Sequence, residues 1–336
     1  MSVTIKDVAK QANVSVATVS RILNNLPGYS EETKQKVVKV IDELGYQPNA
    51  IARGLISKKT NTMGVLLPKV SDLFASEILA GIEDVAHEFD HSVIICKTDK
   101  DGTRTMKYLQ TLREKQVDGI IIVSEYITKE YYDMLTRMNI PVVLVATQSN
   151  YDIPCIKVDD FKASYEAVTY LLDKGHIHIG MISGTRSDKM TTTPRVHGYR
   201  QALIDSGLPF TENAVAYGDF GFQSGIECMQ QLLSHQKHLT AVFCASDEMA
   251  IGALSYLYKQ GIKVPEQISL LGYDNTATAQ KAIPPLTTIE QPLYKMGRRA
   301  FEVLIKGERK VNLIYPHRII ERDTVTNREP IALLNK

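Results

Sequence analysis

From residue 62 onward, short apolar runs alternate with longer amphipathic stretches, and this alternation constrains the fold more than any other feature of the chain. The apolar runs predict strands at 62–67, 92–96, 117–123, 141–146, 177–183, 214–217, 241–244 and 268–273. The stretches between them predict helices at 74–89, 103–115, 128–138, 162–174, 194–206, 223–234 and 247–260. Short apolar strands interleaved with helices are typical of a parallel sheet covered on both faces. The pattern fills two arrays of similar size, so we expect an α/β core of two doubly wound parallel-sheet subdomains with a cleft between them.

The N-terminal residues follow a different, all-helical pattern. The apolar residues of a first short helix fall on one face at helical spacing: Ile5, Val8, Ala9 and Ala12. Residues 13–15 interrupt this run, and Ser15 is placed to cap a second short helix that buries Val19 and Ile22. That helix turns four side chains outward: Val16, Ala17, Ser20 and Arg21. Two short helices joined by a tight turn predict a helix-turn-helix, with an ordinary surface helical hairpin as the alternative.

A longer helix and a weak helical segment follow. Ser30 caps the helix at 31–44, Gly45 ends it, and its expected apolar stripe is Val37, Val38, Val40, Ile41 and Leu44. The segment 49–57 contains Gly54 and is followed by two lysines. A helix this short, with little apolar surface, is marginal by itself, so we expect it to form only when a partner holds it.

Charge is distributed unevenly along the chain. The net charge is only +1, yet residues 1–60 carry nine lysines and arginines against five acidic residues. A basic N-terminal region on a mildly acidic remainder favours a small phosphate-binding module joined to a part that does not bind DNA. A chance fluctuation of charge is the alternative.

Seven short motifs, taken in order, resemble those of the LacI/GalR (lactose-repressor) family of bacterial transcription regulators. They are TIKDVA at 4–9, VSVATVSR at 14–21, GYQPN at 45–49, VDGII at 117–121, SDEMAIGA at 246–253, GYDN at 272–275 and PPLTTI at 284–289. The resemblance extends from about Thr4 to Arg328. It implies a helix-turn-helix DNA-binding domain at 1–48 and a hinge helix with linker at 49–60. The remainder, 61–336, would be an effector-binding and dimerisation core similar to periplasmic binding proteins.

The resemblance also implies that three chain crossings join the two core subdomains. We expect the crossings near 146–154, near 276–292 and after residue 316. The N-subdomain would then comprise about 61–150 and 276–292, and the C-subdomain about 151–275 and 293–336.

Ligands of open α/β sheets bind outside the carboxyl ends of the strands, and several polar and aromatic residues of this chain fall there. Phe220 and Phe74 could each offer a flat face to a sugar ring, while Asp274 and Arg195 could pair with hydroxyl groups. The family resemblance implies effector-binding roles for Arg195, Phe220 and Asp274. The full set expected to bind or line the effector site is Phe74, Asp159, Arg195, Phe220, Ser246, Asp274 and Gln291, with Asp72 as a further candidate. Helix capping by Asp274 or Asp159, and a core position for Phe220, remain the alternatives.

The same resemblance implies that a homodimer binds a roughly palindromic operator in double-stranded DNA. Val16 and Ala17 would contact thymine methyl groups and Arg21 a guanine edge, while Leu55 of the hinge would enter the minor groove. The expected DNA-contacting set is Thr4, Ser15, Val16, Ala17, Ser20, Arg21, Asn24, Ser30, Thr33, Asn49, Ala52 and Leu55.

We therefore interpret the chain as a repressor of carbohydrate-utilisation genes that is controlled by a sugar or a sugar phosphate. One alternative is a catabolite-control-type regulator whose co-repressor, a phosphorylated carrier protein, docks near Asp84 and Phe89. Another is a sugar-binding protein without a regulatory role. An enzyme is not expected, because the sequence has no GxxxxGK, GxGxxG, GxSxG or HExxH motif, and neither a cofactor nor a metal is implied.

The remaining expectations concern location and assembly. The absence of a signal peptide and of a long apolar segment predicts a cytoplasmic protein with no membrane partner. The four cysteines lack metal-binding spacing and are expected to be buried and reduced. The chain ends soon after Arg328 without a heptad extension, which favours a dimer over a tetramer.

Overall fold

The structure is a computed structural model that describes residues 3–24, 26–46, 59–99 and 102–328. It divides into two compact units, Met1–Thr60 and Asn61–Lys336. The predicted hinge helix at 49–57 lies outside the described residues, as do Asn49, Ala52 and Leu55 within it.

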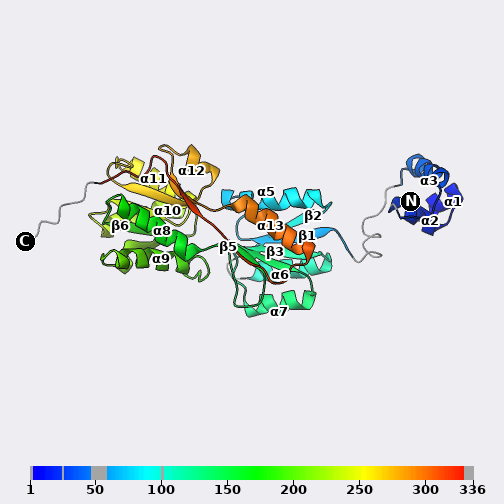
Figure 1. Ribbon diagram of the computed structural model, residues 1–336, viewed down its shortest axis with the longest axis horizontal. Coiled ribbons are helices and arrows are strands. Elements are labelled where there is room, and N and C mark those ends of the chain that lie inside the picture. Colours follow the sequence, from blue (N-terminus) through cyan, green and yellow to red (C-terminus); the bar gives the residue numbers. More distant parts are fainter. Residues whose placement is uncertain (1–2, 25, 47–58, 100–101, 329–336) are drawn as a thin grey trace, which may run out of the picture. The chain divides into compact units, whose positions relative to one another are not determined.

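The described residues of the first unit form three helices around a small core (Figure 1). They are α1 (Ile5–Ala12), α2 (Val16–Leu23) and α3 (Glu31–Leu44). The buried residues are Val8, Ala9, Ala12, Val19, Ile22, Val37 and Val40. The helices predicted from the sequence are confirmed, but Val38 does not belong to the apolar stripe, since it is 42% exposed. Val37, Val40, Ile41 and Leu44 already complete the spacing of one face, and Val38 is turned about 100° from Val37 around the helix axis.

The first sheet of the second unit has the strand order β11-β5-β4-β3-β1-β2, and all neighbouring strands are parallel. Its strands are β1 (Thr62–Leu67), β2 (Ser92–Lys97), β3 (Gly119–Val123), β4 (Val142–Val145), β5 (Cys155–Val158) and β11 (Asn312–Tyr315). Along β1, Val65 and Leu67 contribute to the core cluster that contains Ile78, whereas Leu66 contributes to the cluster that contains Leu109. This alternation fits a sheet covered on both faces.

Helices cover both faces of the first sheet (Figure 1). They are α5 (Leu73–Glu88), α6 (Thr103–Glu114), α7 (Lys129–Met138) and α13 (Leu293–Lys306). The close approach of α5 and α13 requires glycine, because a Cβ on Gly81 would lie 2.1 Å from the carbonyl oxygen of Tyr294. A Cβ on Gly297 would likewise lie 2.1 Å from the carbonyl oxygen of Ile78. Two helices far apart in sequence therefore form one layer on this sheet.

The second sheet has the order β12-β10-β9-β8-β6-β7, in which only the β10–β12 pair is antiparallel. Its strands are β6 (Ile179–Ser183), β7 (Val215–Tyr217), β8 (Ala241–Cys244), β9 (Ser269–Asp274), β10 (Thr287–Glu290) and β12 (Arg318–Ile320). The helices around it are α8 (Asp160–Asp173), α9 (Thr192–Asp205), α10 (Phe222–His235), α11 (Asp247–Lys259) and α12 (Ala277–Lys281), with a 3-10 turn at η1 (Glu212–Ala214). The expected α/β core with two doubly wound subdomains is confirmed.

The predicted assignment of segments to the two subdomains is wrong in three places. β5 pairs with β4 and β11, so the first crossing lies between Val158 and Asp160 instead of at 146–154. The segment 276–292 was expected in the N-subdomain, but β10 within it pairs with β9 of the second sheet. Conversely, α13 and β11 were expected in the C-subdomain but belong to the subdomain of the first sheet.

Local periodicity cannot reveal which strands and helices pack together when they are distant in sequence. The third crossing, between Tyr315 and Arg318, agrees with the expectation after residue 316.

All four cysteines are buried free thiols, as expected. Burial raises the pKa of the Cys228 thiol to about 11, with the charges of Glu227 and Asp219 adding to the shift. Such thiols are poor nucleophiles at neutral pH. None of the helices in the described ranges has the length and apolar character needed to cross a bilayer.

Candidate ligand site and nucleic-acid interface

The outer face of α2 presents the side chains that the sequence predicted to face outward. Val16 is 42% exposed, Ala17 and Arg21 are also exposed, and Ser20 is half-buried. Val19 and Ile22 lie on the opposite face and pack into the small core. The predicted orientation of α2 is thus confirmed, and an exposed face with one arginine is suited to the major groove of DNA.

The predicted phosphate-contacting hydroxyls have clear local roles at helix ends. Ser15 Oγ accepts a hydrogen bond from the Thr18 amide at 3.1 Å. Ser30 Oγ likewise accepts from the Thr33 amide at 3.2 Å. Both serines are therefore N-caps, and the amino ends of α2 and α3 carry the partial positive charge that attracts phosphate.

Two further candidates are also engaged within the first unit. The Thr4 hydroxyl donates to Asp7 Oδ2 at 2.7 Å. The Asn24 side-chain amide donates to the Ser20 carbonyl at 2.8 Å. Both residues are exposed, so these contacts position side chains that remain accessible on the surface.

In the second sheet, Arg195 lies at the centre of the predicted ligand-site residues. This α9 residue is 4% exposed, and its Nε donates to Asp160 Oδ1 at 2.9 Å. Its Nη1 donates to the carbonyl oxygen of Ala245 at 2.6 Å, which ties α9 to the end of β8. The guanidinium also lies 3.7 Å from the ring centre of Tyr273 and 5.9 Å from that of Phe220. The sequence led to Arg195 and Phe220 but not to Asp160 or Tyr273.

Asp274 ends β9 with a positive φ of 116° and is 6% exposed. Gln291, another predicted residue, donates from Nε2 to Asp274 Oδ1 at 2.7 Å. Burial holds the pKa of Asp274 well above its usual range, and the negative charge of Asp247 adds to this shift. The two predicted residues are therefore brought together, with a carboxyl group that favours its neutral form.

Asp247 was not among the candidates, although it stands within the SDEMAIGA motif. It is fully buried and accepts hydrogen bonds from the Thr276 amide at 2.7 Å and from the Thr288 hydroxyl at 2.6 Å. Burial raises its pKa to about 6, against the opposing effect of these hydrogen bonds. Asp247 therefore holds the loop that directly follows Asp274 at the end of β9.

Phe220 and Ser246 lie together. Phe220 has a positive φ of 65°, and its ring is so close to Gly184 that a Cβ there would lie 1.9 Å from Phe220 Cζ. Ser246 caps α11 by accepting from the Met249 amide at 3.2 Å, and its hydroxyl donates to the Phe220 carbonyl at 3.3 Å. Phe220 is only partly buried.

The remaining candidates are placed differently. Asp159 accepts from the Lys162 amide at 3.0 Å and caps α8, which confirms the alternative considered for it. Phe74 is the second residue of α5 and packs partly buried against the main core. Asp72 caps α5 through the Ala75 amide at 2.8 Å.

Residues after strands of the two sheets meet across the subdomain boundary. Lys69, after β1, donates from Nζ to the Asp219 carbonyl, after β7, at 3.0 Å. The charge of Asp72 also acts on Asp274 and Glu248 of the second subdomain. The carboxyl ends of both sheets thus contribute to one region.

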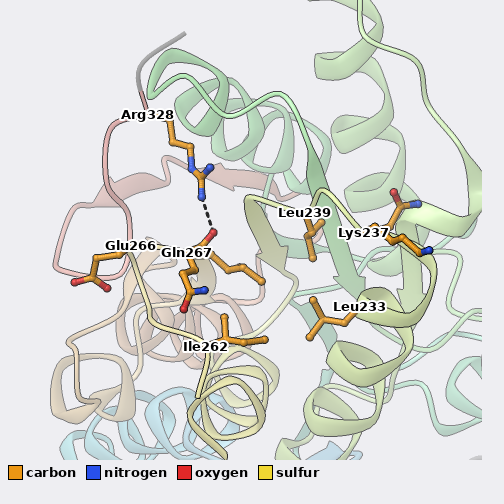
Figure 2. Close-up of a pocket in the computed structure, with 9 residues that line it drawn as sticks. Leu233, Lys237, Leu239, Ile262, Glu266, Gln267 and Arg328 are labelled. Atoms are coloured by element: carbon orange, nitrogen blue, oxygen red, sulfur yellow. Dashed lines mark hydrogen bonds between the residues drawn. The ribbon is translucent and has the colours of Figure 1, made fainter. Parts of the chain in front are cut away.

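A separate cavity of about 350 Å³ lies elsewhere in the second subdomain (Figure 2). Leu239 and Ile268, which precede β8 and β9, help to line it, so it lies at the amino ends of these strands. Arg328 borders it and donates to the Gln267 carbonyl at 2.6 Å. None of the predicted site residues lines this cavity. In the described ranges, no group of histidine, cysteine or acidic side chains is arranged to hold a metal ion.

Two family models match the chain. Residues 60–323 match periplasmic binding proteins and the sugar binding domain of the LacI family, and residues 4–49 match bacterial regulatory proteins of the lacI family. Catabolite control protein A of Priestia megaterium is 39% identical over 325 residues, covering 95% of this chain and 98% of that protein.

Solved structures of transcription regulators are also similar to this chain. The lac repressor dimer bound to operator and the anti-inducer ONPF aligns with a TM-score of 0.87 at 27% identity, covering 97% of this chain and 100% of that one. The complex of the transcriptional regulator CelR with cellobiose aligns with a TM-score of 0.74 at 29% identity, covering 96% and 99%. The named relatives are transcription regulators.

Proposed function

The chain belongs to the LacI family of bacterial regulatory proteins, and we propose that it represses carbohydrate-utilisation genes under the control of a bound sugar. It is a transcription regulator. The observation that carries the proposal is that one chain matches both the DNA-binding model and the sugar-binding model of the family. The relatives act as regulators, so we propose that this chain acts by binding alone and catalyses no reaction. Its site of action would be the cytoplasm, where the bacterial chromosome lies.

We propose that α2 binds in the major groove of a roughly palindromic operator. The exposed Val16 and Ala17 would contact thymine methyl groups, and Arg21 would pair with a guanine edge. Ser15 and Ser30 would direct the amino ends of α2 and α3 toward phosphates. Supporting positions are proposed for Thr4, Ser20, Asn24 and Thr33, together with Asn49, Ala52 and Leu55.

We propose that the sugar binds where the predicted residues of the second sheet converge. Asp274 and Gln291 would pair with its hydroxyls, and its ring would stack on the partly buried Phe220. Arg195, buried and bonded to Asp160, would hold this arrangement and offer its remaining donors. Ser246, Asp159 and Phe74 would complete the surrounding surface. Because residues from both sheets meet here, the bound sugar would favour one relative position of the subdomains.

We propose that the active form is a homodimer, as in the lac repressor complex. Ile283 is 91% exposed and Tyr258 is 84% exposed, and they lie near the ends of the contacting helices α12 and α11. Exposed apolar side chains that gather into one patch are typical of an interface, so we propose that these two residues contribute to the dimer contact. Ile283→Asp should convert the dimer to a monomer in sedimentation, whereas Lys281→Asp, at an exposed neighbouring position, should not.

A second candidate function is control by a protein co-repressor, favoured by the 39% identity to catabolite control protein A. On the outer layer of the first sheet, Tyr294 donates to Asp84 and Arg298 pairs with Glu88 at 3.0 Å. Phe89 next to them is 43% exposed. A protein could dock on this surface without entering the sugar site.

Selection from random double-stranded DNA with the purified full chain tests the main proposal. We expect enrichment of a roughly palindromic sequence, and a sugar from a panel of mono- and disaccharides should change the affinity for it. Failure to enrich any sequence would contradict the proposal. An enriched operator that responds to no sugar, but does respond to a phosphorylated carrier protein, would favour the second candidate.

A further inference from the structure

The cavity of about 350 Å³ at the amino ends of β8 and β9 is lined by aliphatic side chains that the proposed function does not use. Leu239 and Ile268 are buried members of the main core, whereas Leu233 and Ile262 are half-buried and pack against it. Figure 2 shows Leu233, Leu239 and Ile262 around the same space. These four residues form what we call the apolar groove, and its volume is sufficient for a ligand or for several side chains.

Arg328 borders the apolar groove and is held there by its backbone and its side chain. Its amide donates to the Lys174 carbonyl at 2.7 Å, and its Nη2 donates to the Gln267 carbonyl at 2.6 Å. A Cβ on Gly175 would lie 2.2 Å from the Arg328 carbonyl oxygen, so the chain passes close against this turn. The residues that follow Arg328 therefore start at the border of the apolar groove.

Those residues, 329–336, have the sequence EPIALLNK and lie outside the described ranges. Positions 331–334 form a run of four apolar residues: Ile331, Ala332, Leu333 and Leu334. Such a run is unfavourable when it is exposed to water, so it is expected to pack against an apolar surface. An extended chain of five residues, as from Arg328 to Leu333, spans at most about 18 Å. The apolar groove is the surface beside which this segment begins.

We propose that residues 331–334 pack into the apolar groove of their own chain. The groove and the segment are both aliphatic, so their contact removes apolar surface of both from water. Attachment through Arg328 gives the segment an effective concentration of about millimolar at the groove, so a modest affinity is enough for docking. The contact would cover the main core at the end of the second sheet opposite the proposed sugar site. It requires neither DNA nor sugar and is independent of the proposed function.

A single tryptophan tests the proposal, because the chain contains none. Leu333→Trp in the full chain places an apolar fluorescent side chain within the segment. We expect its emission to lie to the blue of the emission of the same variant unfolded in urea, and its quenching by acrylamide to be weaker, because the indole would be shielded from water. Emission and quenching equal to those of the unfolded chain would overturn the proposal.

Two matched pairs of variants, made in the Leu333→Trp chain, locate the contact. Ile262→Glu in the groove should shift the emission back to that of the unfolded chain. Ile204→Glu, at a position on α9 that is 46% exposed and does not line the groove, should leave the emission unchanged. Leu334→Glu alters the segment itself without changing the described core, and it should have the effect of Ile262→Glu. Asn335→Glu adds the same charge and should not.

The remaining outcomes separate this occupant from others. Circular dichroism checks that each variant is folded, and Leu334→Glu keeps the test valid if Ile262→Glu unfolds the chain. A blue-shifted emission that neither Ile262→Glu nor Leu334→Glu changes would mean that the segment packs elsewhere, which overturns the proposal. An emission that moves to the red on dilution of the protein would show that the segment occupies the groove of a second copy, which overturns docking within one chain.

Discussion

The guanidinium of Arg195 lies 3.7 Å from the centre of the Tyr273 ring, so a buried cation is stacked on a buried aromatic side chain. The Tyr273 hydroxyl donates to Asp160 Oδ1 at 3.3 Å, and the same oxygen accepts from Arg195 Nε. The three side chains form a closed arrangement that joins α8, α9 and β9. A residue proposed to bind ligand is therefore also part of the internal framework of its subdomain.

Replacing Asp160 should destabilise the chain strongly. Asp160→Asn would leave Arg195 and Lys157 buried without their shared carboxylate, and breaking a buried pair in this way costs about 3–5 kcal/mol. Urea unfolding of the full chain measures this loss. Asp173→Asn, at the exposed end of the same helix, should shift the midpoint by little. If both variants unfold at the wild-type midpoint, the buried network contributes no net stability.

The sequence predicted the elements whose apolar periodicity is strong, such as β1 and α3, with the bounds that the structure shows. It did not predict α13 or β11 as parts of the first subdomain, because their partners α5 and β5 are distant in sequence. At the site, the sequence predicts Asp159 as a lining residue, whereas the structure shows Asp160 bonded to Arg195. Neighbouring residues at a helix start point about 100° apart, and only the packing of α8 on α9 shows which of them faces Arg195.

Asp247 should make the stability of the chain depend on pH. Burial raises its pKa in the folded chain to about 6, against 3.8 for an aspartate exposed to water. The native state therefore binds this proton more tightly than the unfolded state does, and the bound proton stabilises the fold. This stabilisation is complete below about pH 3.8 and is lost as the pH rises through 6. The loss is about 3 kcal/mol over that interval.

Asp247→Asn removes this titration. The free energy of unfolding of the variant, minus that of the wild type, should therefore increase between pH 4 and pH 7. Any difference in hydrogen bonding to Thr276 and Thr288 adds a constant offset, which the comparison across pH removes. A difference that stays constant across this range would show that Asp247 ionises normally in the folded chain.

Arg21 should contribute to operator specificity more than to general DNA affinity. Arg21→Ala is expected to cost about 1–3 kcal/mol on the operator and much less on random DNA, since a guanine contact depends on sequence. Lys36→Ala, which removes an exposed cation from α3, should weaken binding to both DNAs alike. Fluorescence anisotropy with both DNAs distinguishes these results. Equal losses for Arg21→Ala would identify it as a phosphate contact.

Gly184 should control sugar binding through Phe220 alone. A Cβ at position 184 would overlap the ring, so Gly184→Ala should displace Phe220 and weaken binding of the effector sugar by about tenfold, as Phe220→Ala should. Operator affinity without sugar should stay within about twofold, because neither residue belongs to the first unit. The double variant is the decisive measurement. If Gly184 acts only by placing the ring, adding Gly184→Ala to Phe220→Ala should cause almost no further loss. Additive losses would instead mean that the added methyl group blocks the ligand directly, and the ring of Phe220 would then not be what Gly184 positions.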